Sequence, residues 1–95
     1  MKRIITSRGG GKTRRLIQIS SDTNNYIVAF NPHDVADQAN KMNVNIPFPL
    51  TYDEFLNGQY NESGINGVLI DNAEMLIQHM SKVPVKAVSI SIDDE

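Results

Sequence analysis

The sequence predicts an α/β fold in a single domain of residues 1–95, with a mostly parallel sheet of about four strands flanked by helices. Two observations favour this fold. Short apolar segments that are typical of strands alternate along the chain with segments of helical periodicity, which implies parallel pairing through right-handed crossovers. In addition, a glycine-rich loop follows the first predicted strand, and ligands bind at the carboxyl ends of strands in such sheets.

The first half of the chain contributes two predicted strands and two predicted helices. Ile4–Ile5 ends a short strand, and a helix is expected from about Lys12 to Ser20, where apolar residues gather on one side. Tyr26–Phe30 is apolar and partly β-branched, as expected for a buried parallel strand. Asn31 then caps a helix that begins at Pro32, where the missing proline N–H costs nothing.

The middle of the chain predicts an edge segment and a short helix. Segment 43–50 contains two prolines, which exclude a central strand and leave an edge segment or a loop. Thr51 and Glu54 form a capping box, in which each side chain bonds the backbone N–H of the other. The short helix that follows is expected to stop at Gly58.

The last third predicts a strand, a helix and a final strand. Val68–Ile70 is a strand that ends at Asp71, and Ala73–Met80 is a helix. Segment 87–92 alternates apolar and small residues, which is typical of a strand with one well-buried face. The helix residues expected to point inward are Met75, Leu76, His79 and Met80.

The glycine loop predicts a phosphate-binding site. Three glycines precede Lys12 and Thr13, and their amides can curl around an anion because no Cβ blocks them. The N-terminus of the following helix adds unpaired N–H groups and a partial positive charge. Lys12 would reach the outer phosphates, and the Thr13 hydroxyl would bind Mg²⁺. The full pattern G-x-x-x-x-G-K-[ST] lacks its first glycine, since Thr6 stands there.

Asp71 supplies a second motif. An apolar strand that ends in aspartate is the usual partner of a phosphate loop, because the carboxylate holds the metal or one of its waters. If the sheet is parallel, Asp71 and the glycine loop lie at the same edge. We therefore expect the two motifs to face one another across a bound Mg²⁺.

These residues carry a resemblance to a known superfamily. SRGGGKT resembles the Walker A loop of P-loop NTPases, and VLIDNAE resembles their Walker B strand. The chain as a whole is similar to small AAA-ATPase-like proteins of phages and prophages, in the branch that includes terminases and helicases. The resemblance implies a minimal three-layer P-loop fold that binds ATP and Mg²⁺, with Thr13 and Asp71 at the metal. The nucleotide-binding residues that it implies are Ser7, Arg8, Gly9, Gly10, Gly11, Lys12, Thr13 and Arg14.

The chain departs from this branch at its catalytic position. Many members carry a glutamate directly after the Walker B aspartate, whereas this chain has Asn72, which cannot act as a base. Glu74, three residues beyond Asp71, is the alternative that would reach the same space, although a glutamate in the first turn of a helix is also favoured by the helix dipole alone. Asn72 and Glu74 are therefore the candidate catalytic residues, and an arginine finger would come from Arg8, Arg14 or Arg15 of a neighbouring subunit.

Strand order is left open by the sequence. In the resembled branch the last strand inserts between the first and the third, whereas in kinase-like folds the first strand is central. The inserted order is favoured, because the small Ser89 and Ser91 can lie beneath a packed helix. Either order leaves an open edge strand, through which a protein partner or a second copy could pair.

The composition of the chain excludes several classes of function. The 95 residues carry a formal net charge of −2, so no global attraction to nucleic acid is indicated. Cysteine is absent, which excludes disulfides and thiolate metal sites, and no apolar run is long enough for a membrane span. A cytoplasmic location is expected, and residues 92–95 read as an acidic tail.

Three hypotheses about function follow. The first is a nucleotide-binding P-loop protein with weak or no hydrolysis, which Asn72 and the small size favour. The second is an ATPase that becomes active only as an oligomer or with a partner. The third is a phage interaction or inhibitor protein in which the P-loop is a relic, although the presence of Lys12, Thr13 and Asp71 favours the first hypothesis.

Overall fold

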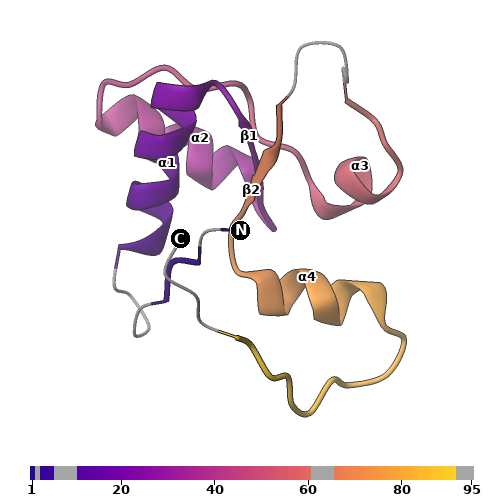
Figure 1. The fold of residues 1–95 in the computed structure, drawn as a ribbon. Coiled ribbons are helices and arrows are strands. Elements are labelled where there is room, and N and C mark those ends of the chain that lie inside the picture. Colours follow the sequence, from indigo (N-terminus) through magenta and orange to yellow (C-terminus); the bar gives the residue numbers. More distant parts are fainter. Residues whose placement is uncertain (2, 6–10, 61–65, 92–95) are drawn as a thin grey trace.

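A pair of parallel strands lies between helices in the computed structural model, which describes residues 1, 3–5, 11–60 and 66–91 (Figure 1). The chain is therefore a small α/β structure, as predicted. Most elements begin where local sequence signals place them. The elements are α1 (Lys12–Thr23), β1 (Tyr26–Val28), α2 (Pro32–Lys41), α3 (Tyr52–Leu56), β2 (Val68–Ile70) and α4 (Ala73–Met80).

β1 is the central element of the sheet. It pairs in parallel with β2, and Ile27 lies opposite Leu69 in the register. On its other side Val28 forms a parallel bridge with Leu50, whose N–H donates to the carbonyl of Ile27 at 2.8 Å. The proline-containing segment before Leu50 therefore contributes one edge residue and no central strand, as predicted from Pro47 and Pro49.

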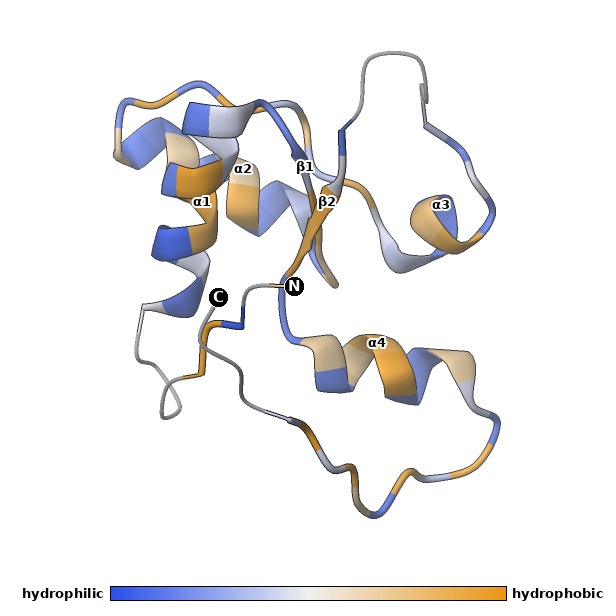
Figure 2. Cartoon of the chain, viewed as in Figure 1, coloured by the Kyte–Doolittle hydropathy of each residue, from blue (hydrophilic) through white to orange (hydrophobic). Residues whose placement is uncertain are grey.

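Helices cover both faces of β1, so the apolar core is divided in two. Successive strand residues point to opposite faces, and Ile27 and Val28, both fully buried, belong to different clusters. The cluster around Ile27 packs against α1 and α2, and the cluster around Val28 packs against α3 and α4 (Figure 1). Figure 2 shows β2 hydrophobic along its length, and its three residues are each half-buried.

Two predicted caps are confirmed. The side chain of Asn31 accepts from the N–H of Asp34, and Pro32 begins α2. Thr51 and Glu54 form the reciprocal capping box of α3: Thr51 Oγ1 accepts from the N–H of Glu54 at 3.0 Å, and Glu54 Oε1 accepts from the N–H of Thr51 at 2.8 Å. These short-range bonds need no tertiary context, which explains why they were predictable.

The expected four-stranded sheet is not found, because two predicted strands are absent from the described residues. Residues 3–5 and 87–91 form no strand, and Val88 and Ile90 are 47% and 60% exposed instead of buried. After α4 the chain is held by hydrogen bonds to that helix and not by the sheet. Gln78 of α4 donates to the carbonyl of Val83 at 2.9 Å and accepts from the N–H of Val85 at 2.7 Å, so its side chain takes the place of a strand partner.

Element boundaries and one helix face also differ from expectation. α1 continues to Thr23, beyond the expected end at Ser20, and β1 stops at Val28, before Phe30. In α4 only Leu76 is buried, whereas Met75, His79 and Met80, also expected to point inward, are exposed. α4 enters the apolar cluster through Leu76, whereas the ring of His79 lies against Tyr52 of α3, with 5.5 Å between the ring centroids, and its Nε2 bonds Asp53. No helix within the described ranges has the length and apolar character needed to cross a membrane.

We expect Thr51→Ala to lower the free energy of unfolding by about 0.5–2 kcal/mol, because it removes the capping oxygen of α3. For a domain of this size each kcal/mol lowers the melting temperature by about 4–8 °C. The control is Ser21→Ala at an exposed position of α1, which should change stability by less than about 0.5 kcal/mol. Thermal unfolding followed by circular dichroism measures both, and equal losses would contradict the capping role.

Candidate functional site

Four polar residues from two motifs meet where α1 begins and β2 ends. Thr13 Oγ1 donates to Asp71 Oδ2 at 3.1 Å, and Lys12 Nζ donates to Asn72 Oδ1 at 2.9 Å. These pairs are about sixty residues apart in the sequence, and the fold brings them together as the two motifs predicted. The site therefore contains a cation, a hydroxyl, a carboxylate and an amide within direct contact.

Gly11 shapes the start of α1. It occupies the N-cap position with φ of 81°, a left-handed conformation that favours glycine. Its carbonyl accepts from the N–H of Arg15 at 3.2 Å, which begins the helical pattern. Within the part of the chain that the structure describes, no side chain caps α1, so the first N–H groups of this helix lack an internal acceptor.

Asn72 connects β2 to α4 through an unusual backbone conformation. Its φ of 56° lies in the left-handed region, which asparagine tolerates better than other non-glycine residues. It stands at the N-cap of α4 without capping that helix by its side chain, which instead accepts from Lys12. A glutamate here would have to adopt the left-handed backbone at a cost of about 1–2 kcal/mol, and this geometry explains the asparagine.

Asp71 is the buried carboxylate of the site, with only 7% of its surface exposed. Its N–H donates to the carbonyl of Val28 at 2.9 Å, which extends the strand pairing by one residue and fixes the carboxylate at the sheet edge. Its Oδ2 accepts from Thr13, whereas Oδ1 is buried without a hydrogen-bond partner among the described residues. An unpaired buried carboxylate oxygen is costly, so it marks a place where a cation or water would bind favourably.

The Thr13–Asp71 pair fits the requirements of Mg²⁺. Adjacent oxygen ligands of an octahedral Mg²⁺, at about 2.0–2.1 Å from the metal, lie roughly 2.9 Å apart, close to the 3.1 Å between Thr13 Oγ1 and Asp71 Oδ2. The described residues contain no group of three or more His, Cys, Asp or Glu side chains that could hold a metal. Mg²⁺ usually takes one or two protein carboxylates and completes its shell with phosphate oxygens and waters, so two protein oxygens suffice.

A pocket of about 210 Å³ opens beside this pair. Thr13, Asp71 and Asn72 line one side, and Phe30, Asn31 and Asp34, which follow β1, line another. Asp34 was not predicted as a site residue from the sequence, although the residues after β1 lie at the same carboxyl edge of the parallel sheet as Asp71. The placement of ligands at the carboxyl ends of parallel strands is therefore the sequence signal that points to Asp34.

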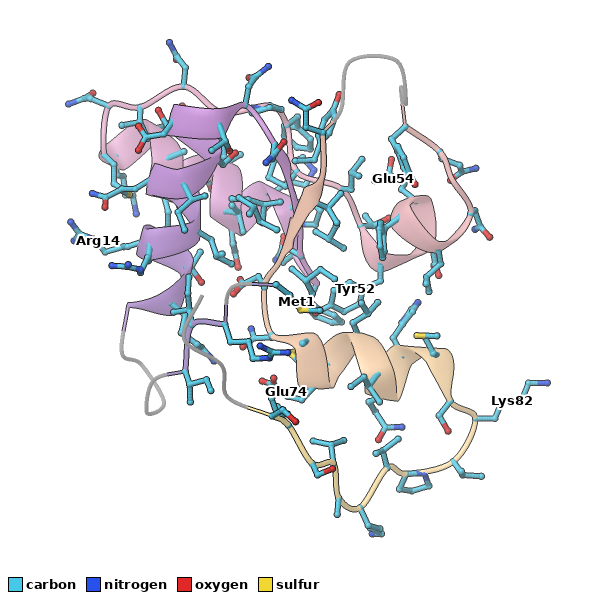
Figure 3. The ribbon with its side chains drawn as sticks, in the orientation of Figure 1. Met1, Arg14, Tyr52, Glu54, Glu74 and Lys82 are labelled. Carbon is cyan, nitrogen blue, oxygen red and sulfur yellow. The ribbon has the colours of Figure 1, made fainter. Side chains whose placement is uncertain are left out.

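The other predicted site residues divide into three groups. Arg14 is exposed and projects from α1 away from the sheet (Figure 3), so it is not brought into contact with the four central residues. Glu74, in the first turn of α4, is exposed and is absent from the lining of the pocket. Ser7, Arg8, Gly9 and Gly10 lie outside the described residues, as does the tail at 92–95.

Tyr52 of α3 supports the backbone of the site. The phenol is buried, and its hydroxyl donates to the carbonyls of Asp71 at 3.2 Å and Asn72 at 3.5 Å. Burial raises the pKa of Tyr52 above its ordinary value of 10.0, and the nearby charges of Asp71 and Glu74 raise this pKa further. Because Tyr52 bonds the turn between β2 and α4, it restrains the backbone that presents Asp71 and Asn72.

Tyr52→Phe is expected to cost about 0.5–1.5 kcal/mol of stability at pH 7, since it removes these hydrogen bonds and keeps the ring. Unfolded tyrosine ionises near pH 10, before the folded residue does. The contribution of Tyr52 is therefore fully present below pH 10 and is lost as the pH rises through its raised folded pKa. Urea unfolding from pH 7 to pH 11 should show a steeper alkaline decline for the wild type than for Tyr52→Phe, and parallel profiles would contradict the raised pKa.

Comparison with protein-family models, with curated proteins and with solved structures finds no match. Assignment of the site therefore depends on the contacts made by the chain's own residues. The contacts that bear on it most directly are Thr13 to Asp71 and Lys12 to Asn72.

Proposed function

We propose that this protein binds a nucleoside triphosphate, such as ATP, as its Mg²⁺ complex where α1 meets β2. Thr13 and Asp71 hold the metal, and Lys12 contacts the outer phosphates. The observation that carries the proposal is the 3.1 Å contact between Thr13 Oγ1 and Asp71 Oδ2, beside a buried carboxylate oxygen that has no partner among the described residues. When bound, Mg²⁺ would bridge phosphate oxygens and offset their charge.

Lys12 is well suited to exchange its present partner for phosphate. Its ammonium donates to the amide oxygen of Asn72, which is neutral, so the lysine charge is not offset by this contact. The bond from the ammonium to Asn72 has a charged donor and a neutral acceptor, whereas a phosphate oxygen also carries charge on the acceptor and so adds Coulombic attraction. Transfer of the ammonium from Asn72 to a phosphate oxygen is therefore favourable.

The start of α1 adds a second source of attraction for phosphate. The first N–H groups of a helix lack internal acceptors and carry a partial positive charge, and α1 has no side-chain cap within the described residues that would occupy them. The left-handed Gly11 lets the chain turn into the helix close to the anion. In the proposed complex, Ser7 to Gly10 contribute further backbone amides, as the Walker A resemblance implies.

In this proposal the protein binds nucleotide and hydrolyses it slowly. Asn72 stands where the NTPases that the sequence resembles carry a glutamate, and an amide cannot take a proton from water. Glu74, the other candidate, is exposed and does not line the pocket beside Thr13 and Asp71. A missing arginine finger alone lowers hydrolysis by about 10³–10⁵, so slow turnover is expected of an isolated chain.

A minimal P-loop arrangement is part of this proposal. Among the described residues the sheet has two strands, fewer than the four that the sequence predicts. Support for the proposal does not require all four strands, because the contact between Thr13 and Asp71 already exists with two.

We expect MgATP to raise the melting temperature. At a ligand concentration near one hundred times Kd, binding contributes about 2.7 kcal/mol of stability, which corresponds to roughly 10 °C or more in a domain this small. Thermal shift with ATP, ADP and GTP measures this, and chelation of Mg²⁺ should reduce the shift. Unchanged melting with all three nucleotides at millimolar concentration would contradict the proposal.

Lys12→Ala should weaken MgATP binding at least tenfold, because it removes charge-assisted hydrogen bonds to phosphate. The matched control is Lys82→Ala, which removes an exposed lysine just beyond the far end of α4 (Figure 3) and should leave the affinity unchanged. Isothermal titration calorimetry gives both affinities, and circular dichroism confirms the fold. Equal affinities for the two variants would exclude Lys12 as a phosphate ligand.

A further inference from the structure

The pocket beside the metal pair is small and open to solvent. Its volume of about 210 Å³ lies below the range of about 300–1,000 Å³ that encloses drug-sized ligands. The space is large enough for several waters. A terminal phosphoryl group and an attacking water fit this space, whereas the base and sugar would lie outside it.

Two carboxylates line this pocket, and they differ in environment. Asp71 is buried, is bonded to Thr13 and has one oxygen without a partner among the described residues. Asp34, on the first turn of α2, is exposed, and its Oδ2 accepts from Asn31 Nδ2 at 3.1 Å. A carboxylate has a second oxygen, so this bond orients Asp34 and leaves it able to accept a proton.

We infer that Asp34 is the general base of a slow triphosphate hydrolysis, accepting a proton from a water bound in this pocket. The inference rests on the proposed function, because it presumes that the terminal phosphate lies beside Thr13 and Asp71. It assigns to α2 the role that the sequence suggested for Asn72 or Glu74. Asn72 is an amide already bonded to Lys12, and Glu74 does not line the pocket.

The step balances without another reactant. The water oxygen forms a bond to the terminal phosphorus, and the bond from that phosphorus to the oxygen bridging the β-phosphate breaks. The bonding electrons remain on the nucleoside diphosphate. One water proton passes to Asp34, and the products are the nucleoside diphosphate and inorganic phosphate.

A purely structural role for Asp34 makes a different prediction. An acidic residue in the first turn of a helix is stabilised by the helix dipole, and the N–H of Asp34 is bonded to the capping side chain of Asn31. In that case a substitution would alter stability and leave the rate constant unchanged. Asp37 offers a matched control, because it is an exposed aspartate of the same helix that does not line the pocket.

The test combines binding with single-turnover hydrolysis. MgATP affinity, melting temperature and phosphate release from γ-labelled ATP are measured for the wild type, Asp34→Asn, Asp34→Glu and Asp37→Asn. General-base catalysis contributes about 10²–10⁴-fold, so Asp34→Asn should lower the hydrolysis rate constant at least tenfold while its MgATP affinity stays within about threefold. Asp34→Glu should retain more activity than Asp34→Asn, and Asp37→Asn should match the wild type.

Separate outcomes identify which proposal fails. Failure of the wild type to bind MgATP would overturn the proposed function itself. Normal binding with equal rate constants for Asp34→Asn and Asp37→Asn would overturn only the role of Asp34. Normal binding with no phosphate release above the protein-free blank would also overturn it. If Asp34→Asn were unfolded, Asp34→Ser would be judged by the same comparison.

Discussion

The structure depends on the burial of β1 on both of its faces. This strand has only three residues, yet Ile27 and Val28 are fully buried, and they belong to apolar clusters on opposite sides of the sheet. α1 and α2 pack on one side, and α3 and α4 pack on the other (Figure 1). Each buried aliphatic side chain contributes roughly 1.5–3 kcal/mol, so loss of β1 would release both halves of the core.

The same strand also aligns the site. Because β1 pairs in parallel with β2, the residues after both strands emerge at one edge, where Asp71 bonds the carbonyl of Val28 through its N–H. α1 packs on β1 through Leu16 and Ile17, which sets the position of its first residues, Lys12 and Thr13. Packing of the core and geometry of the site are thus consequences of one arrangement.

The sequence predicts those features that depend on local signals. The cap at Asn31 and the capping box at Thr51 are confirmed, because their bonds link neighbouring residues. The two motifs also predicted the meeting of Thr13 with Asp71, although residues 3–5, which the prediction placed in a strand before the glycine loop, form no strand. The strand expected at 87–92 was wrong for the described residues, because alternation produces a strand only where an edge accepts it. Gln78 holds the preceding residues away from the sheet.

The roles of two residues required three-dimensional information. The bond of Asn72 to Lys12 follows from a left-handed backbone, which a single asparagine in a sequence does not reveal. In the sequence, Asp34 has the features of any acidic residue in the first turn of a helix. Only the lining of the pocket associates it with Asp71. Pockets arise from the spacing between elements, and periodicity carries no information about that spacing.

The contact between Lys12 and Asn72 has a consequence for the entropy of ligand binding. A free lysine side chain samples many rotamers, and ordering it costs up to about 1.5–2 kcal/mol. In this protein the ammonium is already held at 2.9 Å by a neutral acceptor beside the site, so much of that ordering has taken place before any anion arrives. Asn72, which is unable to act as a base, thereby preorganises the Lys12 ammonium for an anionic ligand.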